Sequence, residues 1–285
     1  MSVVQLNHVT VWTPERKILV DDVSWNVGAG EHWVVIGPNG AGKTTLLSVV
    51  GAERHPSDGK AVILGETFGR TDMRALRSRI GRVDPNLRML DWVNAQEAVL
   101  TGIRNQIWPK WDEWTPDDYV RAHELLELMG CADMAEQEIK TLSQGERQRI
   151  RIARSLIAEP ELLLLDEPAT GLDFPAREAL LGSLDQLART RPELTTIMVS
   201  HHLEELPSTI THVMLMKATQ ILAQGKAREM LTSELISECF GFPIRVQEFD
   251  GRWSARAEAG WTASEKRLVP SAVAEGIVDP YPDEA

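Results

Sequence analysis

The segment 37–45, which reads GPNGAGKTT, constrains the fold more than any other part of the chain. It fits the pattern G-x-x-x-x-G-K-S/T, in which glycines let backbone N–H groups turn toward a bound phosphate. The apolar run 33–36 before it is typical of a buried strand, and the apolar run 45–50 after it, which ends at Gly51, predicts a short helix. A plain glycine-rich turn is the alternative, but a strand and a helix in these places favour nucleotide binding.

The helix that begins at the end of this loop adds the positive end of its dipole to the predicted phosphate site. Within the loop, we expect Lys43 to contact the β- and γ-phosphates of a nucleotide and the Thr44 hydroxyl to hold Mg²⁺. The expected nucleotide-binding residues of the loop are Gly37, Pro38, Asn39, Gly40, Ala41, Gly42, Lys43, Thr44 and Thr45.

Composition limits the class of protein. Of the 285 residues, 25% are charged and 43% are hydrophobic, which is ordinary for a globular chain that buries its own core. The net charge of −12 argues against nonspecific binding of nucleic acid. The two cysteines, Cys131 and Cys239, have no metal-binding spacing and favour a reducing compartment. No apolar run approaches the roughly 18 residues of a membrane span and no signal-peptide profile is present, so we expect a soluble intracellular protein.

Strand-like and helix-like segments alternate along the chain, which predicts an α/β fold with a mostly parallel core sheet. Short connections between the opening strands indicate an antiparallel edge sheet, and a helical pattern at about 86–140 indicates an inserted helical subdomain. The predicted strands are 3–11, 23–27, 31–36, 60–64, 79–83, 162–165, 195–200, 213–216 and 221–223. The clearest predicted helices are 117–129, 143–158 and 175–190.

Two carboxylates follow the fully apolar segment 162–165. Asp166 and Glu167 would stand at the C-terminal edge of the sheet, where open α/β sheets bind their ligands. We expect Asp166 to hold Mg²⁺ through its water shell. We expect Glu167 to polarise the water that attacks the γ-phosphate, and a carboxylate base in such a role contributes about 10²–10⁴ in rate. A strand that ends in a charged turn is the alternative.

The segment 142–146, which reads LSQGE, opens a predicted helix with Ser143 as its N-cap and Glu146 as the capping-box partner. A capping box alone has a structural explanation, but here a basic helix follows it. The segment resembles the signature motif L-S-G-G-Q of the ATP-binding cassette (ABC) ATPase family. Gln144 replaces one glycine of that motif and Glu146 replaces its glutamine, whereas Ser143 and Gly145, which can face a phosphate, are kept.

The resemblance covers roughly residues 3–240, and the chain looks like a single-cassette bacterial ABC transporter ATP-binding subunit. It implies ATP as the nucleotide, Mg²⁺ as cofactor, and a loop 171–173 that crosses to another subunit. It also implies that Trp12 stacks on adenine, the alternative being an ordinary strand aromatic, and that His201 contacts the γ-phosphate, with His202 as the alternative. The expected catalytic residues are then Glu167 and His201, the Mg²⁺ ligands Thr44 and Asp166, and the ATP contacts Trp12, the loop 37–45, Ser143 and Gly145.

One element departs from the family pattern. After the segment 80–83 the family places a glutamine that contacts Mg²⁺ and the attacking water, whereas this chain has Asp84, Pro85 and Asn86, with Pro85 at the expected position. We expect hydrolysis to survive this change. The side-chain oxygens of Asp84 or Asn86 can hold water or Mg²⁺ and would replace the glutamine in part.

The resemblance implies ATP binding and hydrolysis by the energy-coupling subunit of an ABC membrane transporter, an importer being favoured. It implies a permease partner, no nucleic acid, and a cytoplasmic position at the inner face of the membrane. Two cassettes would close head to tail, with Ser143 of one completing the ATP site of the other, so a homodimer is the simplest assembly. A soluble ABC ATPase that acts on ribosomes or DNA is the alternative. We expect an ATP-binding domain at 1–240 and a C-terminal extension at 241–285, of which 269–285 is acidic, rich in proline and partly disordered.

Three tryptophans, Trp108, Trp111 and Trp114, lie within seven residues and among prolines that disfavour a regular helix. They either pack under the loop, against the helical subdomain, or form an apolar patch that receives a cytoplasmic helix of the permease. Full burial of all three rings would exclude the second alternative.

Overall fold

A six-stranded sheet forms the centre of the molecule. The structure is a computed structural model that describes residues 2–83 and 89–258 of the chain. The strand order is β10–β9–β3–β8–β7–β6, and neighbours are parallel except for β10, which is antiparallel to β9. In that order the strands are Gln220–Lys226, His212–Lys217, His32–Ile36, Thr195–Ser200, Leu162–Asp166 and Ile80–Val83. The predicted α/β fold with a mostly parallel core sheet is confirmed.

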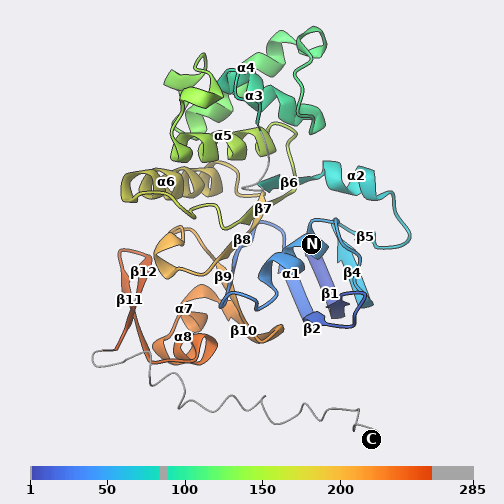
Figure 1. The fold of residues 1–285 in the computed structure, drawn as a ribbon, viewed down its shortest axis with the longest axis vertical. Helices are drawn as coiled ribbons and strands as arrows, with labels where there is room; N and C mark the ends of the chain where they lie inside the picture. The colour runs from blue at the N-terminus through green and yellow to red at the C-terminus, as the bar shows by residue number, and fades with distance from the viewer. Residues whose placement is uncertain (1, 84–88, 259–285) are drawn as a thin grey trace, which may run out of the picture.

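A second, antiparallel sheet has the order β2–β1–β4–β5 and lies at one side of the core beside α1 (Lys43–Val50) (Figure 1). In that order its strands are Ile18–Gly28, Ser2–Trp12, Asp58–Ile63 and Glu66–Thr67. Buried and exposed residues alternate over much of β2, as expected for a strand with one face on the core. The predicted antiparallel edge sheet is therefore present, with longer strands than the apolar segments alone indicated.

The helices α3, α4 and α5 gather at one end of the molecule, at the top of Figure 1. They span Ala95–Leu100, Pro116–Leu128 and Gln144–Leu156. Three-residue and four-residue 3₁₀ turns, among them Thr101–Arg104 and Trp111–Glu113, occupy parts of the region where the sequence predicted a helical pattern. Ser143 caps α5 as predicted, but the helix ends two residues before the predicted residue 158. Helix α2 (Met73–Ser78), capped by the Asp72 side chain, was not predicted.

Strand β7 is apolar on both faces because each face packs against a different hydrophobic core. Leu163 and Leu165 contact the core that includes α5 and α6 (Phe174–Thr190), whereas Leu162 and Leu164 contact the core formed with α1 and the antiparallel sheet. All four leucines are buried. Such two-sided burial explains why the segment shows no alternation of polar and apolar residues.

The C-terminal part contains structure that the sequence pattern did not indicate. Helices α7 (Ala227–Met230) and α8 (Ser233–Phe240) lead into an antiparallel hairpin of β11 (Ile244–Phe249) and β12 (Arg252–Ala257). The hairpin strands are largely polar and partly exposed, so their weak apolar pattern did not predict strands. Its Trp253 is nevertheless buried in the main core. The predicted disordered segment 269–285 lies outside the described residues.

A buried arginine joins α5 to the 3₁₀ turn that follows α3. Arg154 donates from Nε to Thr101 Oγ1 at 2.9 Å and from Nη2 to the Gln106 carbonyl at 2.8 Å. Burial lowers the pKa of its guanidinium to about 10, so the group remains charged at neutral pH. Gly102 lies so close to α5 that a Cβ there would be 2.0 Å from the Arg154 carbonyl oxygen. The turn and the helix therefore behave as one packed unit.

We predict that Gly102→Ala destabilises the protein by about 2 kcal/mol, because an added methyl group has no room against the backbone of α5. Gly182→Ala is the matched control, since its Cβ would meet no described atom within 4 Å and the position lies inside α6. That change should stabilise the helix by about 0.5–1 kcal/mol. Urea unfolding midpoints measure both effects, and a shift in the same direction for the two variants would contradict the packing described.

Candidate functional site

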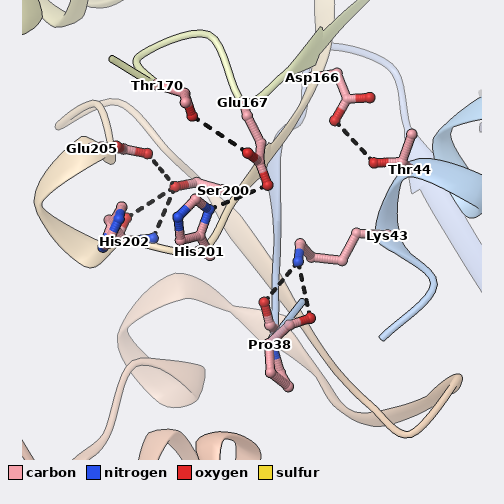
Figure 2. A network of polar contacts seen from close by, with 11 residues as sticks. Pro38, Lys43, Thr44, Asp166, Glu167, Thr170, Ser200, His201, His202 and Glu205 are labelled. Carbon is pink, nitrogen blue, oxygen red and sulfur yellow. Dashed lines mark hydrogen bonds and ion pairs between the residues drawn. The ribbon is translucent and has the colours of Figure 1, made fainter. Parts of the chain in front are cut away.

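The glycine-rich loop lies between β3 and α1 and folds back over its own lysine. Lys43, which is 6% exposed, donates from Nζ to the carbonyl oxygens of Gly37 at 2.8 Å and Pro38 at 3.1 Å (Figure 2). Helix α1 starts after Gly42, whose φ of 95° is left-handed, and no side chain among the described residues caps its first turn. The N–H groups of this turn and the lysine can therefore bind an anion.

Glycine is required where the loop passes neighbouring backbone. A Cβ at Gly37 would lie 2.2 Å from the Met216 carbonyl oxygen, and one at Gly42 would lie 2.4 Å from the Leu19 carbonyl oxygen. These contacts hold the loop against the end of β9 and against β2. The sequence predicted the glycines from their spacing, but it could not identify the segments that they contact.

Two carboxylates, those of Asp166 and Glu167, are close enough to Lys43 for their charges to affect its pKa. Burial lowers the pKa of the Lys43 ammonium, and the negative charges of Glu167 and Asp166 oppose that shift. The strand β7 and the turn after it therefore place negative charge where it favours the charged form of the loop lysine. An incoming polyphosphate would meet both signs of charge within one site.

Thr44 and Asp166, the expected Mg²⁺ ligands, lie in contact with each other. The Thr44 hydroxyl donates to Asp166 Oδ1 at 3.3 Å, from the first turn of α1 to the end of β7 (Figure 2). Hydroxyl and carboxylate oxygens fit the ligand preference of Mg²⁺. No group of three or more His, Cys, Asp or Glu side chains that could hold a metal occurs in the described part of the chain. A cation at this pair would therefore need further oxygens from phosphate and water.

Glu167 lies at the centre of a polar network after β7. Its carboxylate contacts His201 Nδ1 at 3.2 Å and accepts from Thr170 Oγ1 at 3.3 Å (Figure 2). Its φ of 46° is in the left-handed region, which a non-glycine residue adopts at some energetic cost. His202 is exposed and its ring lies beside that of His201, with centroids 4.1 Å apart. Of the two histidines considered in the sequence, His201 is the one that contacts the carboxylate.

An open cavity of about 350 Å³ lies over the loop and reaches Glu167. The sequence did not identify four of its lining residues, because nothing in their local pattern links them to a phosphate site. The described residues that line it are Lys17, Ile18, Leu19, Asn39, Gly40, Gly42, Lys43, Thr44, Thr45, Glu167 and Thr219. Trp12 is not among them. It ends β1, and the Arg16 guanidinium carbon lies 5.1 Å from the centre of its ring.

Ser143 and Gly145 stand apart from this cavity. Ser143 Oγ accepts from the Glu146 N–H at 3.3 Å, and Glu146 Oε2 accepts from the Ser143 N–H at 2.7 Å, which completes the predicted capping box. A Cβ at Gly145 would lie 2.5 Å from Ala176 Cβ, so the small residue lets α5 approach α6. Neither residue is among the described residues that line the cavity over the loop.

A second open cavity, of about 410 Å³, lies between α5 and the loop after β7. Arg147 and Arg151 of α5 line one side and Glu167 lines the other, so Glu167 borders both cavities. The segment 84–88, which includes the predicted substitutes Asp84 and Asn86 for the family glutamine, lies outside the described residues. The structure thus brings together five expected site residues, which are Lys43, Thr44, Asp166, Glu167 and His201. Trp12, Ser143 and Gly145 do not line the cavity over the loop.

Known proteins match this chain over most of its length. Residues 20–170 match the family model described as "ABC transporter". The chain is 37% identical over 247 residues, 86% of this chain and 93% of the relative, to an uncharacterized ABC transporter ATP-binding protein, YlmA of Bacillus subtilis (strain 168). It is 33% identical over 237 residues, 81% of this chain and 69% of the relative, to the molybdate/tungstate import ATP-binding protein WtpC of Thermococcus kodakarensis.

The fold has a counterpart among solved structures. The ADP conformation of MJ1267, an ATP-binding cassette of an ABC transporter, superposes with a TM-score of 0.73 and 22% sequence identity. The superposition covers 82% of this chain and 95% of that chain. This part of the chain thus has the fold of that cassette.

Proposed function

The chain belongs to the ABC transporter family as an ATP-binding ATPase subunit, and we propose that it powers an importer with Glu167 as the base that activates water. The observation that carries this proposal is the contact of Glu167 with His201, 3.2 Å between oxygen and Nδ1. Glu167 lines the same cavity as Lys43 and Thr44. The site therefore combines a phosphate-binding loop with a positioned carboxylate.

In the proposed reaction the loop N–H groups and Lys43 hold the β- and γ-phosphates. Lys43 would leave the Gly37 and Pro38 carbonyls for the phosphate oxygens, which are stronger acceptors for an ammonium. Glu167 takes the proton of the water that attacks the γ-phosphorus, as the bond from that phosphorus to ADP breaks. His201 orients Glu167 and approaches the γ-phosphate. Mg²⁺, held by Thr44 and Asp166, would neutralise charge on the phosphates.

We predict that Glu167→Gln retains ATP binding but slows steady-state hydrolysis at least about 10²-fold, because an amide of the same size cannot accept the proton. The control is Glu193→Gln, the same chemical change at an exposed position outside the described cavity over the loop. Phosphate release measures turnover and a fluorescent ATP analogue measures binding. Equal turnover of Glu167→Gln and Glu193→Gln would refute the assignment of the base.

We also propose that ATP joins two copies of the chain. Ser143 and Gly145 open α5 but do not line the described cavity over their own phosphate loop, so a role toward phosphate needs a second subunit. The loop 171–173 lies beside this segment: a Cβ on Gly171 would be 2.9 Å from Gln144 Nε2, and Asp173 caps α6. The signature segment and the crossing loop thus pack together.

We predict that the Glu167→Gln protein changes from monomer to dimer when ATP is added, as measured by light scattering. Ser143→Asp should prevent this change, because aspartate caps a helix as well as serine but repels the phosphates of the partner site. An unaltered melting temperature of that variant shows that the cap is kept. If the variant that carries both Glu167→Gln and Ser143→Asp still forms the ATP-dependent dimer, Ser143 does not face the phosphates of the partner subunit.

The proposed partner is a multi-span permease, which would hold the chain at the cytoplasmic face of the membrane. Among the described residues, none of the helices is both long and apolar enough to cross a bilayer. The proposal assigns membrane crossing to the permease. It retains the expected division into an ATP-binding domain at 1–240 and a C-terminal extension at 241–285.

An exposed aromatic surface supports docking at the helical end of the molecule. Trp108 and Trp111 are 65% and 50% exposed, and Trp92, at 48%, lies about 6 Å from each of them between ring centroids (6.3 and 6.1 Å). Trp114 instead packs against the core and contacts Tyr119 edge to face. Burial under the loop therefore accounts for Trp114 only. The other rings form an apolar patch of the kind that marks interfaces.

We predict that Trp108→Ala leaves the melting temperature and basal ATPase unchanged but weakens association with the permease at least about tenfold. The assay is co-purification with the proposed multi-span permease. Phe249→Ala, which removes an aromatic ring that is 79% exposed at the end of β11, outside the helices α3, α4 and α5, should have no effect on this association. Intact association of the Trp108 variant, or equal loss with the Phe249 variant, would count against docking at this patch.

A further inference from the structure

The turn that carries His201 is held from within by a buried carboxylate. Glu205 lies in the 3₁₀ turn Leu203–Glu205 and is buried. It accepts from the Ser200 hydroxyl at 2.6 Å, and Ser200 Oγ accepts in turn from the His202 N–H at 3.0 Å (Figure 2). These hydrogen bonds join the residues before and after His201 and fix the backbone at the end of β8.

The same turn is held from outside by the C-terminal hairpin. The Glu204 carboxylate accepts from the Ala255 N–H at 2.9 Å, and the Glu204 carbonyl accepts from Arg252 Nη2 at 3.1 Å. Both donors belong to β12. Strand β12 is anchored in turn by Trp253, which is buried in the main core. The hairpin, shown in red below α6 in Figure 1, is therefore fixed to the body of the molecule and presents two donors to this turn.

Arg252 also reaches α6, the helix that follows the loop 171–173. Its Nη1 lies 3.2 Å from Glu178 Oε2 and its Nη2 lies 3.4 Å from Glu178 Oε1. One partly buried guanidinium thus joins α6 to the backbone of the turn after β8. The planar fork of arginine can satisfy a carboxylate and a carbonyl together, which the single ammonium of lysine cannot match.

We propose that Arg252 is a positioning residue for ATP hydrolysis: through the hairpin β11–β12 it fixes the turn 201–205 and so the contact of His201 with Glu167. The inference rests on the proposed function, in which that contact orients the base. It gives the C-terminal hairpin a role in the catalytic geometry, beyond its packing. The contact between His201 and Glu167 is 3.2 Å long, and a small displacement of the turn would break it.

The test compares Arg252→Ala with Arg252→Lys and with Arg228→Ala in the full chain. Arg228 of α7 is the matched control, because it also links the hairpin to the rest of the molecule. Its Nη2 lies 2.9 Å from Glu248 Oε1, on β11 instead of β12. We expect Arg252→Ala to lower kcat roughly tenfold with the KM for ATP unchanged, since misplacement of a catalytic group by about 1 Å costs up to about 10²-fold. Arg252→Lys should recover part of the rate, and Arg228→Ala should match the unaltered protein.

A second readout does not depend on turnover. The imidazole NMR signals of His201, assigned by their loss in His201→Gln, should shift or broaden in Arg252→Ala and stay in place in Arg228→Ala. Unchanged His201 signals together with an unchanged kcat would overturn the proposal. So would a loss of kcat that Arg228→Ala shares in full. If the unaltered chain does not hydrolyse ATP, the proposed function fails, whereas the His201 signals still decide whether Arg252 positions the turn.

Discussion

The burial of β7 on both faces is the constraint on which the rest of the site depends. Its four leucines alternate between two separate cores, and fully burying one such side chain is worth about 1.5–3 kcal/mol. A shift of the strand by one residue would exchange the two sets of leucines and move both carboxylates. The packing of α1, α5, α6 and the antiparallel sheet therefore determines where Asp166 and Glu167 emerge. The positions of these two carboxylates therefore follow from apolar packing on the two faces of the strand that precedes them.

Interactions between charged and polar groups then hold these side chains relative to one another. Burial disfavours the charged form of Lys43, while Glu167 and Asp166 favour it. Thr44 and His201 each engage one of those carboxylates, from α1 and from the end of β8. The groups come from three elements, namely the start of α1 and the ends of β7 and β8, so their spacing depends on how these elements meet at the sheet edge. This is the expected behaviour of a site at the carboxyl ends of parallel strands.

The sequence predicted the parts of the site that depend on local spacing. The loop 37–45, the capping box at Ser143 and the apolar strand before Asp166 each have a short pattern with a direct physical reason, and the structure contains all three. The left-handed backbone of Glu167 and the lining residue Thr219 depend on contacts between distant segments, which no local pattern encodes. The hairpin β11–β12 was missed because its strands are largely polar. Ile244 and Trp253 are its buried residues.

The buried guanidinium of Arg154 has a mechanical consequence for the helical end of the molecule. Because a charged group in the interior cannot lose its hydrogen-bond partners cheaply, the bonds to Thr101 and Gln106 resist sliding of this segment along α5. The exposed ring of Trp108 follows two residues after Gln106. Ser143 caps the other end of α5, 11 residues before Arg154 and so about 16 Å away along the helix. A displacement of the aromatic surface would thus move α5 as a rigid body, and Ser143 would move with it.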